Sequence, residues 1–159
     1  MNYVIKQAEI EDLPEAIALV KEVFMEFEAP VYSEEGVEYF MQGLNYEQMR
    51  EGLTQRQHKI WVCRDLDTAE LIGVIRGRPP GHINLLFVAK KHHRKGIARA
   101  LFNEYAKYCK ADAITEITVN SSPYAVEAYR KLGFCETDSE QVTNGIRATP
   151  MKKIDLRGN

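Results

Sequence analysis

Residues 87–101 read FVAKKHHRKGIARAL: an apolar strand end, a run of cationic and imidazole side chains, one glycine, and an apolar stretch typical of a helix. The formal net charge of the whole chain is -2, so this positive charge is a local feature. A loop that leaves a strand and enters a helix exposes unpaired backbone N–H groups, and the helix dipole adds partial positive charge there. The stretch therefore predicts a site for an anion such as phosphate.

Two interpretations of this stretch stay open on its residues alone. In the first, Gly96 lets a ligand approach the main chain, while Arg94, Lys95 and Arg99 surround that ligand with charge. In the second, the run is a solvated basic loop and Gly96 only starts a helix. The motifs GxxxxGK[ST] and GxGxxG are absent from the chain. The common nucleoside triphosphate and dinucleotide loops are therefore excluded.

The rest of the sequence argues against several other kinds of partner. No further basic and aromatic residues accompany the run, so nucleic acid is not expected. His92 and His93 are adjacent and have no CxxC or HxxxH companion, so no metal site is expected. No apolar stretch approaches the roughly 20 residues that cross a bilayer, so no membrane is expected. Residues 1–13 lack a signal-peptide pattern and the three cysteines are far apart, which predicts a cytoplasmic protein.

The order of apolar patterns predicts a mixed α/β fold in one domain over residues 1–159. Strands are expected at 3–8, 60–64, 71–78, 83–88, 117–120, 134–136 and 145–154, and helices at 12–27, 34–42, 46–53, 97–110 and 124–132. Asp12 is expected to cap the first helix in a capping box with Glu15. A strand, helix and strand around the basic run imply two parallel neighbours joined by a right-handed crossover.

A second stretch, VNSSPYAVEAYRKLGF at 119–134, has a purely local interpretation and a wider one. Locally, Gly133 takes a left-handed conformation that ends a helix, Phe134 makes the accompanying contact, and Tyr129 is a core aromatic. Taken with the first stretch, it resembles the GNAT superfamily of N-acetyltransferases, whose acyl-CoA loop reads [QR]xxGx[GA] and whose later helix carries A..(F)Y..LGF. The pair of motifs covers about residues 85–134.

Three positions depart from the pattern of that family. His93 stands where the family usually has Gln or Arg, which puts its side-chain contribution in doubt. Ala98 replaces the second glycine of the loop. Ser122 occupies a position often held by an Asn that contacts the cofactor, a contact that Asn120 is able to make instead.

The resemblance implies a GNAT-like sheet of about seven strands with four or so helices, in which 83–88 splays away from its parallel neighbour 117–120. Acetyl-CoA fills the gap as cosubstrate, its pantetheine pairing with the backbone of Phe87 and Val88, its pyrophosphate on the amides of 94–98. The residues that the resemblance assigns to this cofactor are Phe87, Val88, His93, Arg94, Lys95, Gly96, Ile97, Ala98, Arg99, Asn120 and Ser122.

The implied activity is transfer of an acetyl group from acetyl-CoA to a primary amine of a small molecule or peptide, by direct attack. By the resemblance, the N–H of Val88 or Phe87 polarises the carbonyl and Tyr129 is the general acid. The alternative is a non-catalytic module that binds acyl-CoA as a sensor or scaffold. The presence of Tyr129 favours the enzyme.

The general base and the acceptor amine are not fixed by the sequence. Strand alternation puts His82, Asn84 and Leu86 on the side of Val88, so His82 is a candidate base; it is otherwise a partly exposed residue after a Pro-Pro-Gly turn. Glu26 and Glu28 either attract a cation or form a solvated helix end. The acidic and aromatic segment 28–53 hints at a cationic acceptor. Family members are often dimers, so a homodimer is one expectation.

Overall fold

The computed structural model describes residues 2–154. Its strands are β1 (Tyr3–Gln7), β2 (Lys59–Asp65), β3 (Leu71–Arg78), β4 (His82–Val88), β5 (Ile117–Ser121), β6 (Cys135–Glu136), β7 (Gln141–Thr143) and β8 (Ile146–Lys153). Its α-helices are α1 (Leu13–Phe27), α2 (Glu34–Gln42), α3 (Tyr46–Thr54), α4 (Ile97–Ala111) and α5 (Val126–Lys131). The single domain over 1–159 stays a prediction, because residues 1 and 155–159 lie outside the described part.

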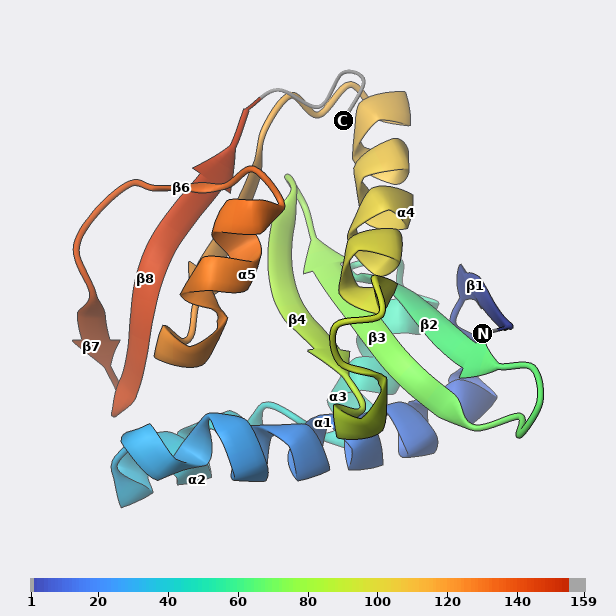
Figure 1. Ribbon diagram of the computed structural model, residues 1–159, viewed down its shortest axis with the longest axis horizontal. Coiled ribbons are helices and arrows are strands. Elements are labelled where there is room, and N and C mark those ends of the chain that lie inside the picture. The colour runs from blue at the N-terminus through green and yellow to red at the C-terminus, as the bar shows by residue number, and fades with distance from the viewer. Residues whose placement is uncertain (1, 155–159) are drawn as a thin grey trace.

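The strands form a mixed sheet in the order β1-β2-β3-β4-β5-β8-β6, with β7 paired to β8 (Figure 1). Of the pairs in this sheet, β4 with β5 is parallel and the others are antiparallel. This confirms the predicted α/β fold, with eight strands where about seven were expected. The strand that sequence patterns missed is β7, whose three residues are exposed and show no apolar alternation.

Two apolar cores lie on opposite faces of the sheet. On one face, α1 and α3 pack with α2 against residues that include Val74, Leu85 and Phe87. On the other face, α4 and α5 pack against residues that include Ile83 and Val88. Figure 1 shows α4 standing across the strands on the side opposite α1. The helices therefore cover both faces, as burial of an apolar sheet requires.

The parallel pair β4 and β5 is joined over only a short length. The paired residues are His82 with Thr118 and Ile83 with Val119, both at the beginning of β4. Beyond them the two strands separate, and in the view of Figure 1 the helix α5 stands between the ribbons of β4 and β8. Along the separated ends, the facing edges of β4 and β5 have no strand partner, as the predicted splay requires.

A β-bulge in β4 changes which side chains share a face. Arg76 of β3 pairs with Leu85, but the next residue, Gly77, pairs with Ile83, which leaves Asn84 as the extra residue. Ile83 and Val88 consequently belong to the core under α4, although their positions differ by an odd number. The prediction that His82 shares the side of Val88 by simple alternation is therefore wrong.

The start of α1 also differs from the sequence prediction. Asp12 does not begin a capping box with Glu15; it ends a turn of 3-10 helix at 10–12 that precedes α1. Its carboxylate accepts a hydrogen bond from the backbone N–H of Glu9 at 2.8 Å. This capping contact closes the 3-10 turn before α1, so it lies one turn earlier in the chain than the sequence predicted.

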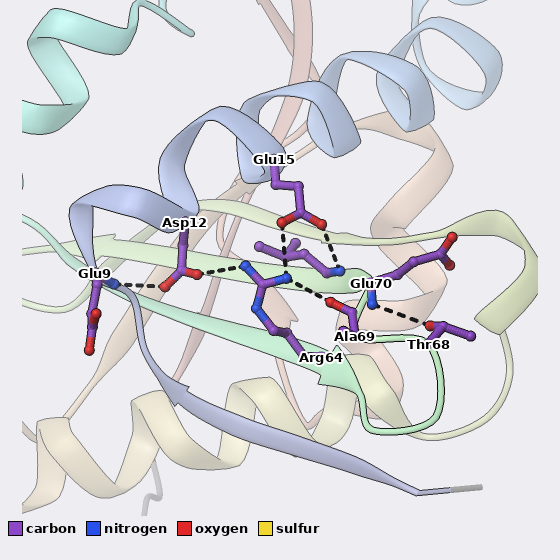
Figure 2. A network of polar contacts seen from close by, with 8 residues as sticks. Glu9, Asp12, Glu15, Arg64, Thr68, Ala69 and Glu70 are labelled. Carbon is purple, nitrogen blue, oxygen red and sulfur yellow. Dashed lines mark hydrogen bonds and ion pairs between the residues drawn. The ribbon is translucent and has the colours of Figure 1, made fainter.

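The carboxylates of Asp12 and Glu15 instead hold Arg64 of β2 (Figure 2). Arg64 donates from Nη2 to Asp12 at 2.6 Å and from Nη1 to Glu15 at 2.9 Å and to the carbonyl of Ala69 at 2.9 Å. Glu15 also accepts from the backbone N–H of Leu71 at 3.1 Å. This network ties the beginning of α1 to β2 and β3, and so fixes the helix on the sheet.

Candidate functional site

The loop between β4 and α4 takes the form that the glycine of the first motif indicates. Gly96 caps the start of α4 with φ +81°, a left-handed conformation that side chains with a Cβ rarely adopt. Arg94 is left-handed as well, at φ 63°. A Cβ placed on Gly96 would meet no atom within 4 Å. Glycine is thus required by the backbone conformation, and the space beside it is open.

The amides of this loop are free to receive a ligand. Within the part of the chain that the structure describes, no backbone N–H from residues 94–98 donates to a loop carbonyl or to a side chain. The side chain of Ile97 is buried in the core, so this residue offers the surface only its amide. The result is a set of N–H groups at the beginning of a 15-residue helix.

The side chains of the basic run divide into two groups. Lys90 and Lys91 form ion pairs with Glu26 at 2.7 Å and with Glu70 at 2.9 Å. Arg94 and Lys95 are exposed and form no ion pair with a described residue. The uncompensated charge of the run therefore lies directly beside the free amides. Arg99, one turn into α4, donates to the carbonyl of Lys131 at 2.9 Å.

His93 is held against the end of β4. Its Nε2 lies 2.7 Å from the carbonyl oxygen of Val88, and its ring centroid lies 5.1 Å from that of Phe27. Because a carbonyl only accepts, Nε2 carries the proton in this contact. His93 thus ties the loop to the strand, whatever further contact it makes with a ligand.

The backbone of β4 presents alternate amides to its two neighbours. The N–H of Ala89 donates to Ile72 of β3 at 2.8 Å. By alternation, the amide of Phe87 also points toward β3, whereas those of Leu86 and Val88 point toward β5 and the splay. Of the two amides that the sequence suggested as a polarising group, the amide of Val88 faces the opening.

A cavity of about 320 Å³ lies where β4 and β5 separate. Its walls come from the end of α1, from α2, from β3, β4 and β5, and from α5. The sequence-predicted residues Phe87, Asn120, Ser122 and Tyr129 line it. The side chain of Ser122 is buried there, and its Oγ makes no hydrogen bond of ordinary geometry with the described residues.

His82 lies outside the lining of this cavity. Its Nδ1 is 2.8 Å from the hydroxyl oxygen of Thr118, at the end where β4 and β5 are still paired. Burial and, secondarily, the charge of Arg78 lower the pKa of His82 to about 4. The ring is therefore neutral at pH 7, and its role as a base stays a prediction that this position does not favour.

Tyr129 is buried in the cavity wall, with its ring packed edge-on against Phe134 at a centroid distance of 5.4 Å. Gly133 has φ +100° and the N–H of Phe134 donates to the Tyr129 carbonyl at 3.0 Å, which confirms the predicted helix ending. Burial, assisted by the charge of Glu28, raises the pKa of Tyr129 well above its ordinary value. The phenol thus stays protonated throughout the neutral range.

Glu28 is the acidic side chain of the cavity lining within the described residues. It follows the last residue of α1, is half-buried, and forms no ion pair there. Burial raises its pKa to about 7, while the nearby Ser122 hydroxyl acts in the opposite direction. From the sequence, Glu26 and Glu28 had the same two interpretations. In the structure Glu26 is exposed and forms an ion pair with Lys90, so only Glu28 belongs to the cavity.

Arg76 of β3 is the basic side chain of the same lining, and sequence reasoning missed it. Its residue is half-buried, and its Nη2 lies 3.1 Å from Nε2 of His58. The available signal was an arginine inside the otherwise apolar strand sequence LIGVIRGR at 71–78.

Within residues 2–154, no three side chains of His, Cys, Asp or Glu come together in a way that could hold a metal ion. Among the helices that the structure describes, none has the length and apolar character needed to span a bilayer.

Comparison with known proteins identifies relatives of this arrangement. The model of the GNAT acetyltransferase domain matches residues 28–154. The PaiA N-acetyltransferase from Thermoplasma acidophilum, in complex with coenzyme A, has a TM-score of 0.82 and 21% identity, over 97% of this chain and 99% of that one. A GCN5-related N-acetyltransferase from Rhodopseudomonas palustris gives 0.81 and 20%, over 97% and 96%.

A more distant match is the spermidine N-acetyltransferase from Vibrio cholerae, in complex with CoA and spermine. It has a TM-score of 0.67 and 19% identity, over 96% of this chain and 95% of that one. No curated protein sequence matches the chain. Structural similarity at such identities shows a shared fold, whereas the domain match covers most of the chain. The chain therefore belongs to the family of GNAT acetyltransferases, enzymes that use acetyl-CoA as the source of the acyl group.

Proposed function

We propose that this protein is an N-acetyltransferase for a primary amine of a small molecule or peptide, with Tyr129 as general acid. The observation that carries the proposal is the cavity between β4 and β5, which is lined by Tyr129 and Glu28. A buried phenol and a carboxyl of raised pKa in one cavity favour an enzyme over a sensor or scaffold without activity.

The residues present fit acetyl-CoA. The unoccupied amides of 94–98, with Arg94 and Lys95 beside them, suit its diphosphate, and the open space at Gly96 leaves room for it. The free edge of β4 suits the pantetheine, as a strand edge suits an added strand. The buried Ser122 hydroxyl and the side chain of Asn120 offer further polar contacts. When bound, acetyl-CoA supplies a thioester whose acyl C–S bond is exchanged for an acyl C–N bond.

The chain's own groups then have distinct tasks. The amide of Val88 donates a hydrogen bond into the splay, where developing negative charge on oxygen needs it. The carboxylate of Glu28 receives a proton from the amine, for which a pKa of about 7 is well placed. The phenol of Tyr129 gives a proton to the departing sulfur. Its raised pKa makes it a weaker acid than free tyrosine but keeps it protonated.

The proposal is tested by mixing the purified protein with acetyl-CoA and a panel of amines and following release of free CoA thiol. Calorimetry with CoA establishes cofactor binding in the same samples. We expect amine-dependent thiol release above slow hydrolysis. Tight CoA binding without release for any polyamine, aminoglycoside, amino acid or peptide N-terminus would contradict the proposed activity.

Two expectations about the wider setting belong to the same proposal. We assign the reaction to the cytoplasm, since Cys63, Cys109 and Cys135 are all unpaired, as in a reducing compartment. The homodimer implied by the family resemblance stays a prediction, which light scattering of the purified protein tests.

A further inference from the structure

Arg76 carries a charge that the described part of the chain does not balance. It forms no ion pair with a described carboxylate, and it lies over no described aromatic ring. Its Nε is fully buried without a partner, and the hydrogen bond that it makes among these residues joins Nη2 to His58. Nη1, which is not fully buried, has no partner in the described chain. Most of the donor capacity of this guanidinium is unused.

His58 positions the guanidinium but does not neutralise it. Burial first, and then the charges of Arg76 and Arg78, lower the pKa of His58 to about 4, so the ring is neutral at pH 7. The ring also packs closely on Gly52 of α3, where an added Cβ would overlap it. A neutral acceptor packed in this way orients the Arg76 guanidinium and leaves its full positive charge in place.

A partly buried charge without a counter-charge is costly, and arginine does not lose its proton in proteins. Burial lowers the pKa of Arg76, and no acidic group of the described residues opposes it. Proteins retain such an arrangement where a ligand supplies the missing charge. The planar guanidinium matches a carboxylate in a two-bond arrangement better than any other side chain.

Among the described residues that line the same cavity, one is acidic, and it lies at a different place. Glu28 lines it from the end of α1, whereas Arg76 lines it from β3. Arg76 is absent from the causes that shift the pKa of Glu28, so the two groups are not direct partners. The lining therefore has a position that favours a cation and a separate position that favours an anion.

We propose that the acceptor is a small molecule of the amino acid type, whose carboxylate binds Arg76 while its amine faces Glu28. This inference rests on the proposed function, since it names the substrate class of the same site. A cavity of about 320 Å³ suits a molecule of that size. The exposed Glu34, Glu35 and Glu38, which hinted at a purely cationic acceptor, do not line the cavity.

The test compares pairs of amines that differ only by the carboxylate. L-lysine is paired with 1,5-diaminopentane and 4-aminobutanoate with propylamine, and 3-aminopropylphosphonate tests whether another anion can replace the carboxylate. Thiol release gives kcat/KM for each, and calorimetry on the protein saturated with CoA gives the affinity for each amine. We expect the carboxylate-bearing member of at least one pair to be favoured about 30-fold, as for a charged group whose buried partner is removed.

The substitution Arg76→Gln then tests whether Arg76 causes the preference for the amine that carries a carboxylate. We expect it to remove the preference, lowering kcat/KM for the amino acid about 30-fold while leaving the decarboxylated amine within about twofold. Arg76→Lys keeps the charge but loses the fork, and should retain part of the preference. Arg78→Gln is the matched control, because Arg78 is exposed, lies on the same strand and does not line the cavity; its preference should be that of the wild type.

Several results would overturn the inference. A wild-type preference for the decarboxylated member of both pairs would show that Arg76 repels the acceptor. If Arg76→Gln lowered kcat/KM equally for both amines of a pair while CoA affinity stayed intact, Arg76 would have only a structural role. A preference for the phosphonate alone would replace the carboxylate by a phosphate-like group. If no amine is acetylated, the proposed function fails, and calorimetry with 4-aminobutanoate and propylamine still decides whether Arg76 binds a carboxylate.

Discussion

The two ends of α1 hold the same kind of side chain in opposite electrostatic states. At the beginning, Asp12 and Glu15 share Arg64 (Figure 2). Burial by itself raises the pKa of Asp12, but the hydrogen bonds and charge of Arg64 outweigh it and hold the pKa below its ordinary value. At the other end, Glu28 has no basic partner among the described residues, and burial raises its pKa to about 7.

The difference lies in what completes each group. At the beginning of α1 the chain supplies the counter-charge from β2, and the result is a fixed joint between helix and sheet. At the end of α1 the chain leaves a carboxyl, a phenol and a guanidinium incomplete around one cavity. Polar groups that lack a partner inside a cavity lower the stability of the folded protein, and they are typical of sites that bind a ligand.

The largest expected effect is at the cavity end. Tyr129→Phe removes the proposed acid but keeps the ring that packs on Phe134. We expect turnover to fall roughly 10²-fold or more, with CoA affinity unchanged, because one general acid contributes about that much. Steady-state thiol release and calorimetry with CoA measure the two quantities. An unchanged rate would remove Tyr129 from the mechanism.

The second prediction separates Glu28 from its neighbour. Glu28→Gln should lower turnover roughly 10²-fold and should abolish the rise of rate through about pH 7 that the carboxyl imposes. Glu26→Gln is the matched control at the same helix end, exposed and paired with Lys90. Its rate and pH profile should equal those of the wild type. A loss shared by both variants would mean that general negative charge matters, and not a base.

Glu28 also affects stability, with a definite sign. A folded pKa of about 7 against an ordinary value of 4.5 means that the folded state binds more protons between these pH values. The free energy of unfolding therefore falls as pH rises through that window. Glu28→Gln should be more stable than the wild type at pH 8, with the gain shrinking toward pH 4. Urea unfolding at both pH values measures it, and a loss of stability at pH 8 would contradict an unpaired carboxylate.

At the opposite end of α1 the sign reverses. Asp12→Asn leaves Arg64 without its closest partner, and we expect a loss of about 1 to 2 kcal/mol in the free energy of unfolding at pH 7. Because the folded pKa of Asp12 is lowered, this contribution is present above its ordinary pKa and is lost as pH falls through the folded value. The variant and the wild type should converge once pH falls below the lowered pKa of Asp12. Thiol release at saturating substrate should stay unchanged.

The smallest effect is expected for the exposed ion pair between Lys90 and Glu26, whose contribution to stability and activity the substitution Lys90→Gln tests. Lys90 and Glu26 are joined at 2.7 Å but both are exposed, so solvent screens their attraction. Lys90→Gln should leave the urea midpoint within measurement error of the wild type, and thiol release with it. A marked loss of CoA affinity would instead show that Lys90 contributes to phosphate binding. A charge that is paired within the protein would then also serve the ligand, as the unpaired charges do.

Sequence reasoning reached the elements and the loop because these depend on neighbours along the chain. The helix that follows Gly96 and the left-handed ending at Gly133 are local, and both were predicted; the left-handed conformation of Gly96 was not. Sequence reasoning failed on the capping box at Asp12, because one oxygen of that carboxylate accepts from Glu9 in the preceding turn and the other from Arg64 of β2. It failed on the face of His82, because a bulge at Asn84 interrupts the alternation.

The amino-acid sequence by itself thus determined the family, the fold and the loop of free amides, since motif spacing and local backbone preference carry that information. The tertiary structure alone decided which charges meet. It paired Glu26 with Lys90 and left Glu28 unpaired, and it brought Arg76 of β3 into the lining of the same cavity. Burial and the distance between charges set these outcomes, and both depend on residues that are far apart in sequence and adjacent only after folding.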